Sequence, residues 1–412
     1  MTAVVPARRA GRTFAPLLTF QSRGYRYLWL ASVLWNQARW MDQVVIGWVV
    51  LEMTDSAFDL AIIGALRWLP LMIFGLAGGA VADRIDRRRL LIGAQAMGML
   101  VCLATAWLLA SGRFDFGLAA LATFLLGLQW ALDWPTRRAL IPDLVGRERT
   151  VNAVALEAVS MNLTRIIGPL VAGALVAYFS PAVAFLAMSA LYVLEIVLLW
   201  AMPLAARPSR TSSGSLMRYL ADGLSRLRQS EPIVGVLLIT ALMNVLVFPY
   251  QQLLPVFARD VLHVDAVGLG ALSAATGVGS FVGATAIASS RRVPHSGVLF
   301  WLGSCAMCAC LVGFALSGEF MLAMALIGVS GLGQAAFASL QSTIVLANAS
   351  DQLRGRAMGA LTLAIGSAPV GTLEVGALAL AAGAPLSVAV NAAACAVLVI
   401  VVGLRLPRFR AS

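Results

Sequence analysis

Lysine is missing from this chain, because all 30 basic residues are arginine. A P-loop needs a lysine for the nucleotide phosphates, and Schiff-base enzymes need a lysine amine. The absence argues against ATP-driven transport by this chain alone and against several enzyme classes. Charge is scarce too, since only 12% of the 412 residues are charged while 60% are hydrophobic.

Histidine and cysteine are also sparse. The two histidines, His263 and His295, fall near loop ends, and no G-x-S-x-G or H-E-x-x-H pattern occurs. The five cysteines lie in apolar runs, and we expect even Cys305 and Cys308 to be packing residues rather than a metal or redox pair. We therefore expect no enzyme, no metal site and no cofactor; an intramembrane enzyme is the disfavoured alternative.

The remaining residues make the chain too apolar to fold as a water-soluble protein. Soluble domains are about 45–50% apolar and about 25% charged. A helix needs about 20 apolar residues to cross the hydrocarbon core of a bilayer. The sequence predicts an all-α membrane protein of about twelve transmembrane helices, with the lipid bilayer as its solvent.

The apolar spans form two sets of six. Between the sets lies a polar stretch in which Leu216–Leu227 has an amphipathic pattern. We predict an N-terminal half over 1–205, a cytoplasmic linker over 206–231 and a C-terminal half over 232–412. The predicted spans are 26–52, 59–82, 90–111, 117–141, 150–178, 182–204, 232–258, 265–290, 294–316, 319–346, 357–380 and 384–406.

The arginines predict the orientation. If the N-terminus is cytoplasmic, 25 arginines fall in cytoplasmic segments and only Arg113 and Arg259 fall outside. The other three, Arg39, Arg67 and Arg165, lie within spans. Because cytoplasmic loops collect basic residues, both termini are expected in the cytoplasm. The same rule accounts for the net charge of +11 without a nucleic-acid partner.

The two halves repeat each other. Arg87-Arg88 after the second span recurs as Arg291-Arg292 after the eighth, and Gly168-Pro169 in the fifth has a counterpart near Pro369 in the eleventh. Two six-helix halves in parallel repeat are typical of one transporter architecture, in which the substrate binds between the halves.

Polar side chains concentrate in spans 1, 4, 7 and 10, whereas spans 3, 6, 9 and 12 hold only Gln95 and Asn391 as amides. We therefore expect the first group to surround a wet cavity and the second group to face lipid. The predicted substrate-binding residues, including one arginine of span 5, are Asn36, Arg39, Asp42, Gln43, Gln129, Arg165, Asn244, Gln251 and Gln334.

Charged residues at membrane depth need water or a partner. An Arg39–Asp42 contact is expected, and Arg67 lies far enough out to reach the interface instead. Asp42, Glu195 and Glu374 are the proton-coupling candidates, because burial favours a neutral carboxyl group. The alternative for each of them is a structural role in helix packing.

The loop after the second span resembles the signature motif of a known family. Gly79-Ala-Val-Ala-Asp83-Arg84-Ile-Asp86-Arg87-Arg88 resembles the G-x-L-a-D-R-x-G-R-R signature of the major facilitator superfamily, departing at Val81 and Asp86. The resemblance implies two six-helix halves that alternate in access. It also implies that Gly79, Asp83, Arg84, Arg87 and Arg88 form a conformational gate that latches the outward-open state.

Further stretches resemble exporters of that superfamily. Arg165–Gly173 looks like their helix 5 motif, with Gly168 and Pro169 allowing a kink and tight packing. Pro135–Val145, Leu254–Asp260 and Arg354–Gly359 resemble the enterobactin exporter and macrolide efflux branch. The resemblance implies a secondary exporter of a small amphipathic or aromatic solute, siderophore-like or drug-like, and we expect a monomer in the inner membrane of a bacterium. The carboxylates near mid-membrane and the lack of a nucleotide site predict proton antiport.

Two alternatives on the same fold stay open: an importer and a non-transporting membrane sensor. The substrate itself is predicted only by charge. Three arginines within spans against one nearby Asp42 leave surplus positive charge in the N-terminal half. We therefore expect an anionic or zwitterionic solute, such as a catecholate-type siderophore, rather than a lipophilic cation.

Overall fold

The structure is a computed structural model that describes residues 19–82, 86–203, 230–289, 295–350 and 353–410. All regular elements in these ranges are helical. Apart from its last two residues, the predicted linker lies outside the described ranges, and so does the amphipathic segment within it.

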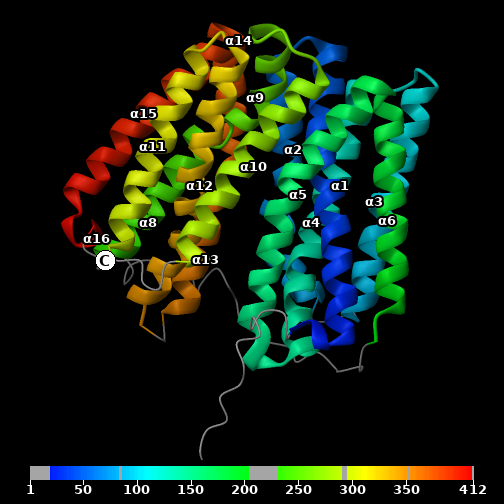
Figure 1. Ribbon diagram of the computed structural model, residues 1–412, viewed down its shortest axis with the longest axis horizontal. Helices are drawn as coiled ribbons and strands as arrows, with labels where there is room; N and C mark the ends of the chain where they lie inside the picture. The colour runs from blue at the N-terminus through cyan, green and yellow to red at the C-terminus, as the bar shows by residue number, and fades with distance from the viewer. Residues whose placement is uncertain (1–18, 83–85, 204–229, 290–294, 351–352, 411–412) are drawn as a thin grey trace, which may run out of the picture.

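The helices form two groups that follow one another in the chain (Figure 1). The first group contains α1 (Arg23–Thr54), α2 (Ala57–Ala82), α3 (Arg87–Ala110), α4 (Phe116–Val145), η2 (Arg147–Arg149), α5 (Thr150–Tyr178) and α6 (Pro181–Ala201). The second contains α8 (Glu231–Leu242), η3 (Met243–Val247), α9 (Tyr250–Val256), η4 (Phe257–Val261), α10 (Ala266–Ser289), α11 (Ser296–Leu316), α12 (Phe320–Asn348), α13 (Arg354–Ile365), α14 (Ala368–Ala382), α15 (Ala384–Arg405) and α16 (Pro407–Arg410).

The predicted spans agree with these helices to within a few residues. The largest difference is at the end of α4, which continues to Val145 instead of ending at 141. Ten of the described helical segments are long and apolar enough to cross a membrane. The chain is therefore a multi-pass membrane protein, while the count of twelve spans stays a prediction.

Local sequence signals set where several helices begin. The side chains of Ser22, Asp86, Asp115 and Ser180 each accept a hydrogen bond from a backbone N–H three residues later. Such caps satisfy amide donors that the first helical turn leaves without an intrahelical partner. Short polar loops thus separate helices whose interiors are almost entirely apolar.

The two groups approach each other most closely at one end of the bundle. We call this the distal end, because it lies opposite the end of the bundle where α16 is found; Figure 1 shows the groups converging there. The main contacts join α5 to α10 and α2 to α14. A methyl group at Gly173 of α5 would overlap the carbonyl of Ala266 of α10, so this approach requires glycine.

The helical segment Glu231–Val261 contains two π-helical turns, the first between α8 and α9 and the second directly after α9. They are η3, which carries Asn244, and η4, which carries Arg259. A π turn widens the helix and changes the direction in which the following side chains point, and such turns are frequent at functional sites. Both of these turns place a polar side chain where the two groups meet.

Candidate functional site

A cavity of about 240 Å³ lies between the two groups of helices. Its wall comes from α1, α2 and α5 on one side and from η3, α9, α12, α13 and α14 on the other. The polar lining residues are Arg39, Gln43, Arg67, Arg165, Asn244, Gln251, Gln252, Gln334, Gln341 and Thr372. The aromatic ones are Trp40, Trp68, Phe248 and Phe337.

Six of the nine predicted substrate-binding residues line this cavity: Arg39, Gln43, Arg165, Asn244, Gln251 and Gln334. The placement brings together side chains from both halves of the chain, as the repeat architecture predicts. Gln252 and Gln341 also line the cavity and were not among the predicted site residues, although both are glutamines of the polar spans.

Arg67, not Arg39, is the ion-pair partner of Asp42. Both members of the pair are largely buried, with 11% and 6% of their side chains exposed. The predicted Arg39–Asp42 contact is therefore wrong, and Arg67 does not extend to the membrane interface. Residues three apart on one helix share a face, but here the neighbouring helix α2 supplies a guanidinium to the carboxylate.

Arg39 is surrounded by aromatic rings instead. Its guanidinium carbon lies 4.0 Å from the ring centroid of Trp130, 5.6 Å from that of Trp40 and 5.8 Å from that of Trp35. Cation–π contacts stabilise a desolvated guanidinium without neutralising its charge. These three tryptophans thus pack against the protein's own Arg39.

Arg165 connects the two halves across the cavity. It donates a hydrogen bond of 2.7 Å to Oε1 of Gln334 on α12, which also accepts one from Ser280 on α10. Its guanidinium lies 5.2 Å from the ring centroid of Trp40. Among the described residues, no carboxylate lies within ion-pair distance of Arg165 or Arg39.

Asn36 and Gln129 are buried but do not line the cavity. Asn36 donates to the backbone oxygen of Ser32, 2.8 Å away, and Gln129 donates to Gln95, 2.6 Å away. The prediction that Asn36 and Gln129 line the cavity is therefore wrong. A helix that lines a cavity does so with one face only, so a polar residue on another face is buried elsewhere. The side chains of Asn36 and Gln129 lie on such faces and are buried within the first half.

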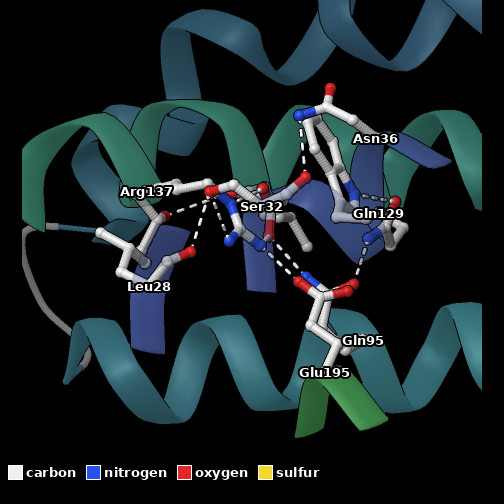
Figure 2. A network of polar contacts seen from close by, with 11 residues as sticks. Leu28, Ser32, Asn36, Gln95, Gln129, Arg137 and Glu195 are labelled. Carbon is white, nitrogen blue, oxygen red and sulfur yellow. Dashed lines mark hydrogen bonds and ion pairs between the residues drawn. The ribbon is translucent and has the colours of Figure 1, made fainter. Parts of the chain in front are cut away.

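The interior of the first half holds a second polar cluster, which we call the Arg137 network (Figure 2). Arg137 donates two hydrogen bonds of 2.8 Å to Asp133 on its own helix and one of 2.5 Å to Glu195 on α6. Gln95 of α3 donates to Asp133 at 2.5 Å, and Arg137 also reaches Ser32 of α1 at 3.2 Å. Side chains of three helices, α1, α4 and α6, thus bond to one guanidinium, and α3 joins the cluster through Asp133.

This network overturns three expectations. Arg137 is a buried residue of α4 rather than a cytoplasmic arginine, because its side chain points inward to Asp133 and Glu195 near the end of the predicted span 117–141. Glu195 is not a lone carboxylate, and Gln95 faces inward rather than toward lipid. The sequence signal that could have found the network is the i,i+4 spacing of Asp133 and Arg137, which places the two side chains on one helix face.

Glu374, the third proton-coupling candidate, lies in the second half. Its Oε2 accepts a hydrogen bond of 2.7 Å from the side-chain amide of Asn391 on α15. Within the described ranges it has no arginine partner. Asn391, like Gln95, was expected to face lipid, and it instead satisfies a carboxyl group of its own half.

The predicted gate is described only in part. Gly79 lies in α2, while Asp83 and Arg84 fall outside the described residues. Arg87 forms a 2.7 Å ion pair with Asp143 near the end of α4 and donates to the carbonyl of Ala139 at 3.0 Å. Arg88 follows it in the first turn of α3.

Gly168 and Pro169 of α5 lie against two different helices. A methyl group at Gly168 would approach Cβ of Trp40 on α1, and the carbonyl of Pro169 lies against Gly270 of α10. Both residues are buried. They therefore sit where α5 contacts both its own half and the other half, close to the cavity.

Two groups of helices around a polar cavity form a fold that is shared with solved transporter structures. Solved structures with this fold include the nucleoside transporter NupG, with a TM-score of 0.75, 12% identity and coverage of 92% of this chain and 99% of that one. Another is a POT family transporter in complex with a peptide conjugate, with a TM-score of 0.76, 12% identity and coverage of 95% and 99%.

The chain belongs to the transmembrane secretion effector family, whose profile matches residues 12–412. It is 24% identical to the staphyloferrin A transporter of Staphylococcus aureus over 84% of this chain and 87% of that one. It is 27% identical to the multidrug efflux pump Tap of Mycobacterium tuberculosis over 88% of each chain. Macrolide efflux protein A of Streptococcus pyogenes is 22% identical over 58% and 60%. These relatives are named as a transporter, an efflux pump and an efflux protein.

Proposed function

We propose that this protein exports an anionic or zwitterionic amphipathic solute in exchange for protons. The proposal includes twelve spans, both termini in the cytoplasm, a bacterial inner membrane and a monomeric carrier. The observation that carries it is the charge of the cavity, which three arginines line while, of the carboxylates in the described ranges, only Asp42 pairs with one of them.

The charge imbalance needs a ligand. With Arg67 paired to Asp42, Arg39 and Arg165 contribute two positive charges held only by rings and an amide. An arginine at the bilayer centre costs at least about 2.5 kcal/mol unless water or a partner compensates it. A bound carboxylate or catecholate group would supply that compensation, whereas a lipophilic cation would add to the repulsion.

The rest of the wall supports an amphipathic body. Trp40, Trp68, Phe248 and Phe337 offer apolar surface, and orphaned polar atoms lie nearby. Oε1 of Gln341 and the indole N–H of Trp40 are buried without a hydrogen-bond partner among the described residues. Buried polar atoms without partners are costly, so a solute that hydrogen-bonds to them would gain affinity.

The direction of transport is supported by the relatives. The multidrug pump and the macrolide protein are named for efflux, and the family is named for secretion. Import through the same cavity is the alternative, since the geometry of a cavity does not set the direction of flux. A proton gradient is the proposed energy source because the chain has no lysine for a nucleotide site.

The test uses everted membrane vesicles from cells with and without the gene and a panel of siderophores, macrolides and dyes of both charges. We expect uptake of anionic amphipathic compounds that collapses when a protonophore is added. Uptake that ignores the protonophore but requires ATP would refute the proposed antiport.

The cavity charge is tested by Arg39→Gln and Arg165→Gln, with Arg113→Gln in an exposed loop as the matched control. We expect both cavity variants, at normal membrane levels, to lose at least tenfold in transport of the anionic compounds, as expected for a lost hydrogen bond to a charged group. Unchanged transport by both, or a parent that prefers cationic dyes, would contradict the proposed substrate class.

A further inference from the structure

The Arg137 network contains more acid than it can neutralise. Asp133 and Glu195 are both fully buried, and one guanidinium serves the two of them. With both carboxyl groups ionised, the cluster carries a net charge of −1 in the interior of the first half. Adding one proton makes it neutral, and buried clusters favour neutrality because there is no solvent to stabilise a surplus charge.

The hydrogen bonds show which oxygen is open to that proton. Both oxygens of Asp133 accept hydrogen bonds, Oδ1 from Arg137 and Oδ2 from Arg137 and Gln95. Glu195 accepts from Arg137 through Oε1 only. Its Oε2 is buried without a hydrogen-bond partner among the described residues. Asp133 is thus satisfied as a carboxylate, whereas Glu195 is half satisfied.

The charged and polar groups around Glu195 come from each of the helices that pack against α6 or complete the network. On α4 these are Asp133 and Arg137, and α3 and α1 contribute the neutral Gln95 and Ser32. Buried Tyr192 lies one turn earlier on α6. Glu157 of α5 also faces Arg137 and has a buried oxygen without a partner, and Arg138 of α4 lies near Glu157 on the exposed side.

We propose that Glu195 is the proton-carrying residue, with Asp133 as the positioning residue that keeps Arg137 from neutralising it fully. The inference deepens the proposed proton antiport and rests on it. The step is a simple proton addition, in which the Glu195 carboxylate gains one proton on Oε2 and becomes a neutral acid. The proton comes from a hydronium ion of the solvent, whose O–H bond breaks as the O–H bond of the acid forms and which leaves as water.

A side chain shared with the cavity connects the proton to the solute. Trp35 of α1 lies between the two sites, with its ring centroid 5.4 Å from the guanidinium carbon of Arg137 and 5.8 Å from that of Arg39. Its indole N–H also donates to Gln129, which hydrogen-bonds to Gln95 of the network. A change in the position of Arg137 would therefore reach Arg39 through one rigid ring.

The test is infrared difference spectroscopy of the full-length protein in detergent, recorded without solute while the pH is lowered from alkaline to mildly acidic. We expect a band of a protonated buried carboxyl group in the parent and its loss in Glu195→Gln. Glu374→Gln and Glu157→Gln are the controls and should keep it. A band that persists in Glu195→Gln, or that disappears only in a control, would overturn the assignment.

Asp133→Asn gives an independent readout if Glu195→Gln does not accumulate. It leaves Glu195 as the single acid partner of Arg137, so we expect a weaker band at the same pH; an unchanged band would overturn the role of Asp133. If the spectra behave as expected but vesicle uptake survives the protonophore, the site binds a proton and antiport is wrong. If uptake collapses but the band persists in Glu195→Gln, antiport stands and the site is wrong.

Discussion

Arg137 and Arg39 lie on neighbouring helices of the same half and are compensated by opposite means. Arg137 binds two carboxylates and a serine hydroxyl. Arg39 has three indole rings around it and no carboxylate within ion-pair distance among the described residues. The same residue type thus occupies an acid-rich cluster in the interior of the half and an acid-poor cavity between the halves.

This difference separates an arginine that is always paired within the protein from one that is free to bind a substrate when the cavity is occupied. A guanidinium that must always be buried needs acids of its own, because removing it from water carries a large penalty. A guanidinium that faces a cavity can remain hydrated when the cavity is empty and bind an anion when it is full. The placement of the acids therefore indicates which arginines are available to a substrate.

The largest expected effect follows from removing the guanidinium of the acid-rich cluster. Arg137→Gln leaves Asp133 and Glu195 buried without a cation, and breaking a buried ion pair in this way costs about 3–5 kcal/mol. We expect low membrane levels and a reduced melting temperature in detergent. The triple variant that also carries Asp133→Asn and Glu195→Gln should recover much of the loss, and an Arg137→Gln protein that melts like the parent would contradict the comparison.

A smaller effect is expected at the single acid of the cavity. Asp42→Asn leaves Arg67 without its partner, and residues in one ion pair couple by about 0.5–3 kcal/mol. A double-mutant cycle of Asp42→Asn with Arg67→Gln should show this coupling in detergent stability. The parallel cycle with Arg39→Gln should show almost none. Equal coupling in both cycles would mean that Asp42 is shared.

The stability of Arg39→Gln tests the comparison between Arg39 and Arg137 directly. Cation–π contacts are worth about 0.5–2 kcal/mol, and the cavity can hydrate the replacement. We expect a stability loss near 1 kcal/mol by thermal denaturation, well below that of Arg137→Gln. A loss as large as that of Arg137→Gln would show that Arg39 is a structural residue after all.

The smallest effect is expected outside both sites, at the distal end. Arg259 of η4 donates to the carbonyl of Leu51 at 3.1 Å and pairs with Asp55, whose side chain is 82% exposed. Exposed pairs contribute about 0.2–1 kcal/mol and weaken in salt. Melting of Arg259→Gln at low and high salt should differ from the parent only at low salt; a large, salt-independent loss would mean that this contact holds the halves together.

Much of the fold follows from apolar spans. The helix boundaries, the two groups of helices and most of the polar cavity-lining residues follow from runs of about 20 apolar residues and from the uneven distribution of polar residues among the spans. The family signature at Gly79–Arg88 adds the superfamily. What the spans do not give is the inward or outward direction of each polar side chain, as Gln95 and Gln129 demonstrate by pointing into their own half.

The sequence by itself determined a lysine-free, multi-pass membrane protein with arginines at membrane depth, and it contained the local Asp133–Arg137 spacing. Only the tertiary structure decided which charges meet. Asp42 is three residues from Arg39 yet pairs with Arg67, 25 residues away, and Glu195 reaches Arg137 across 58 residues. Helical spacing sets the face on which a side chain lies, whereas the packing of neighbouring helices sets the partner that it finds there.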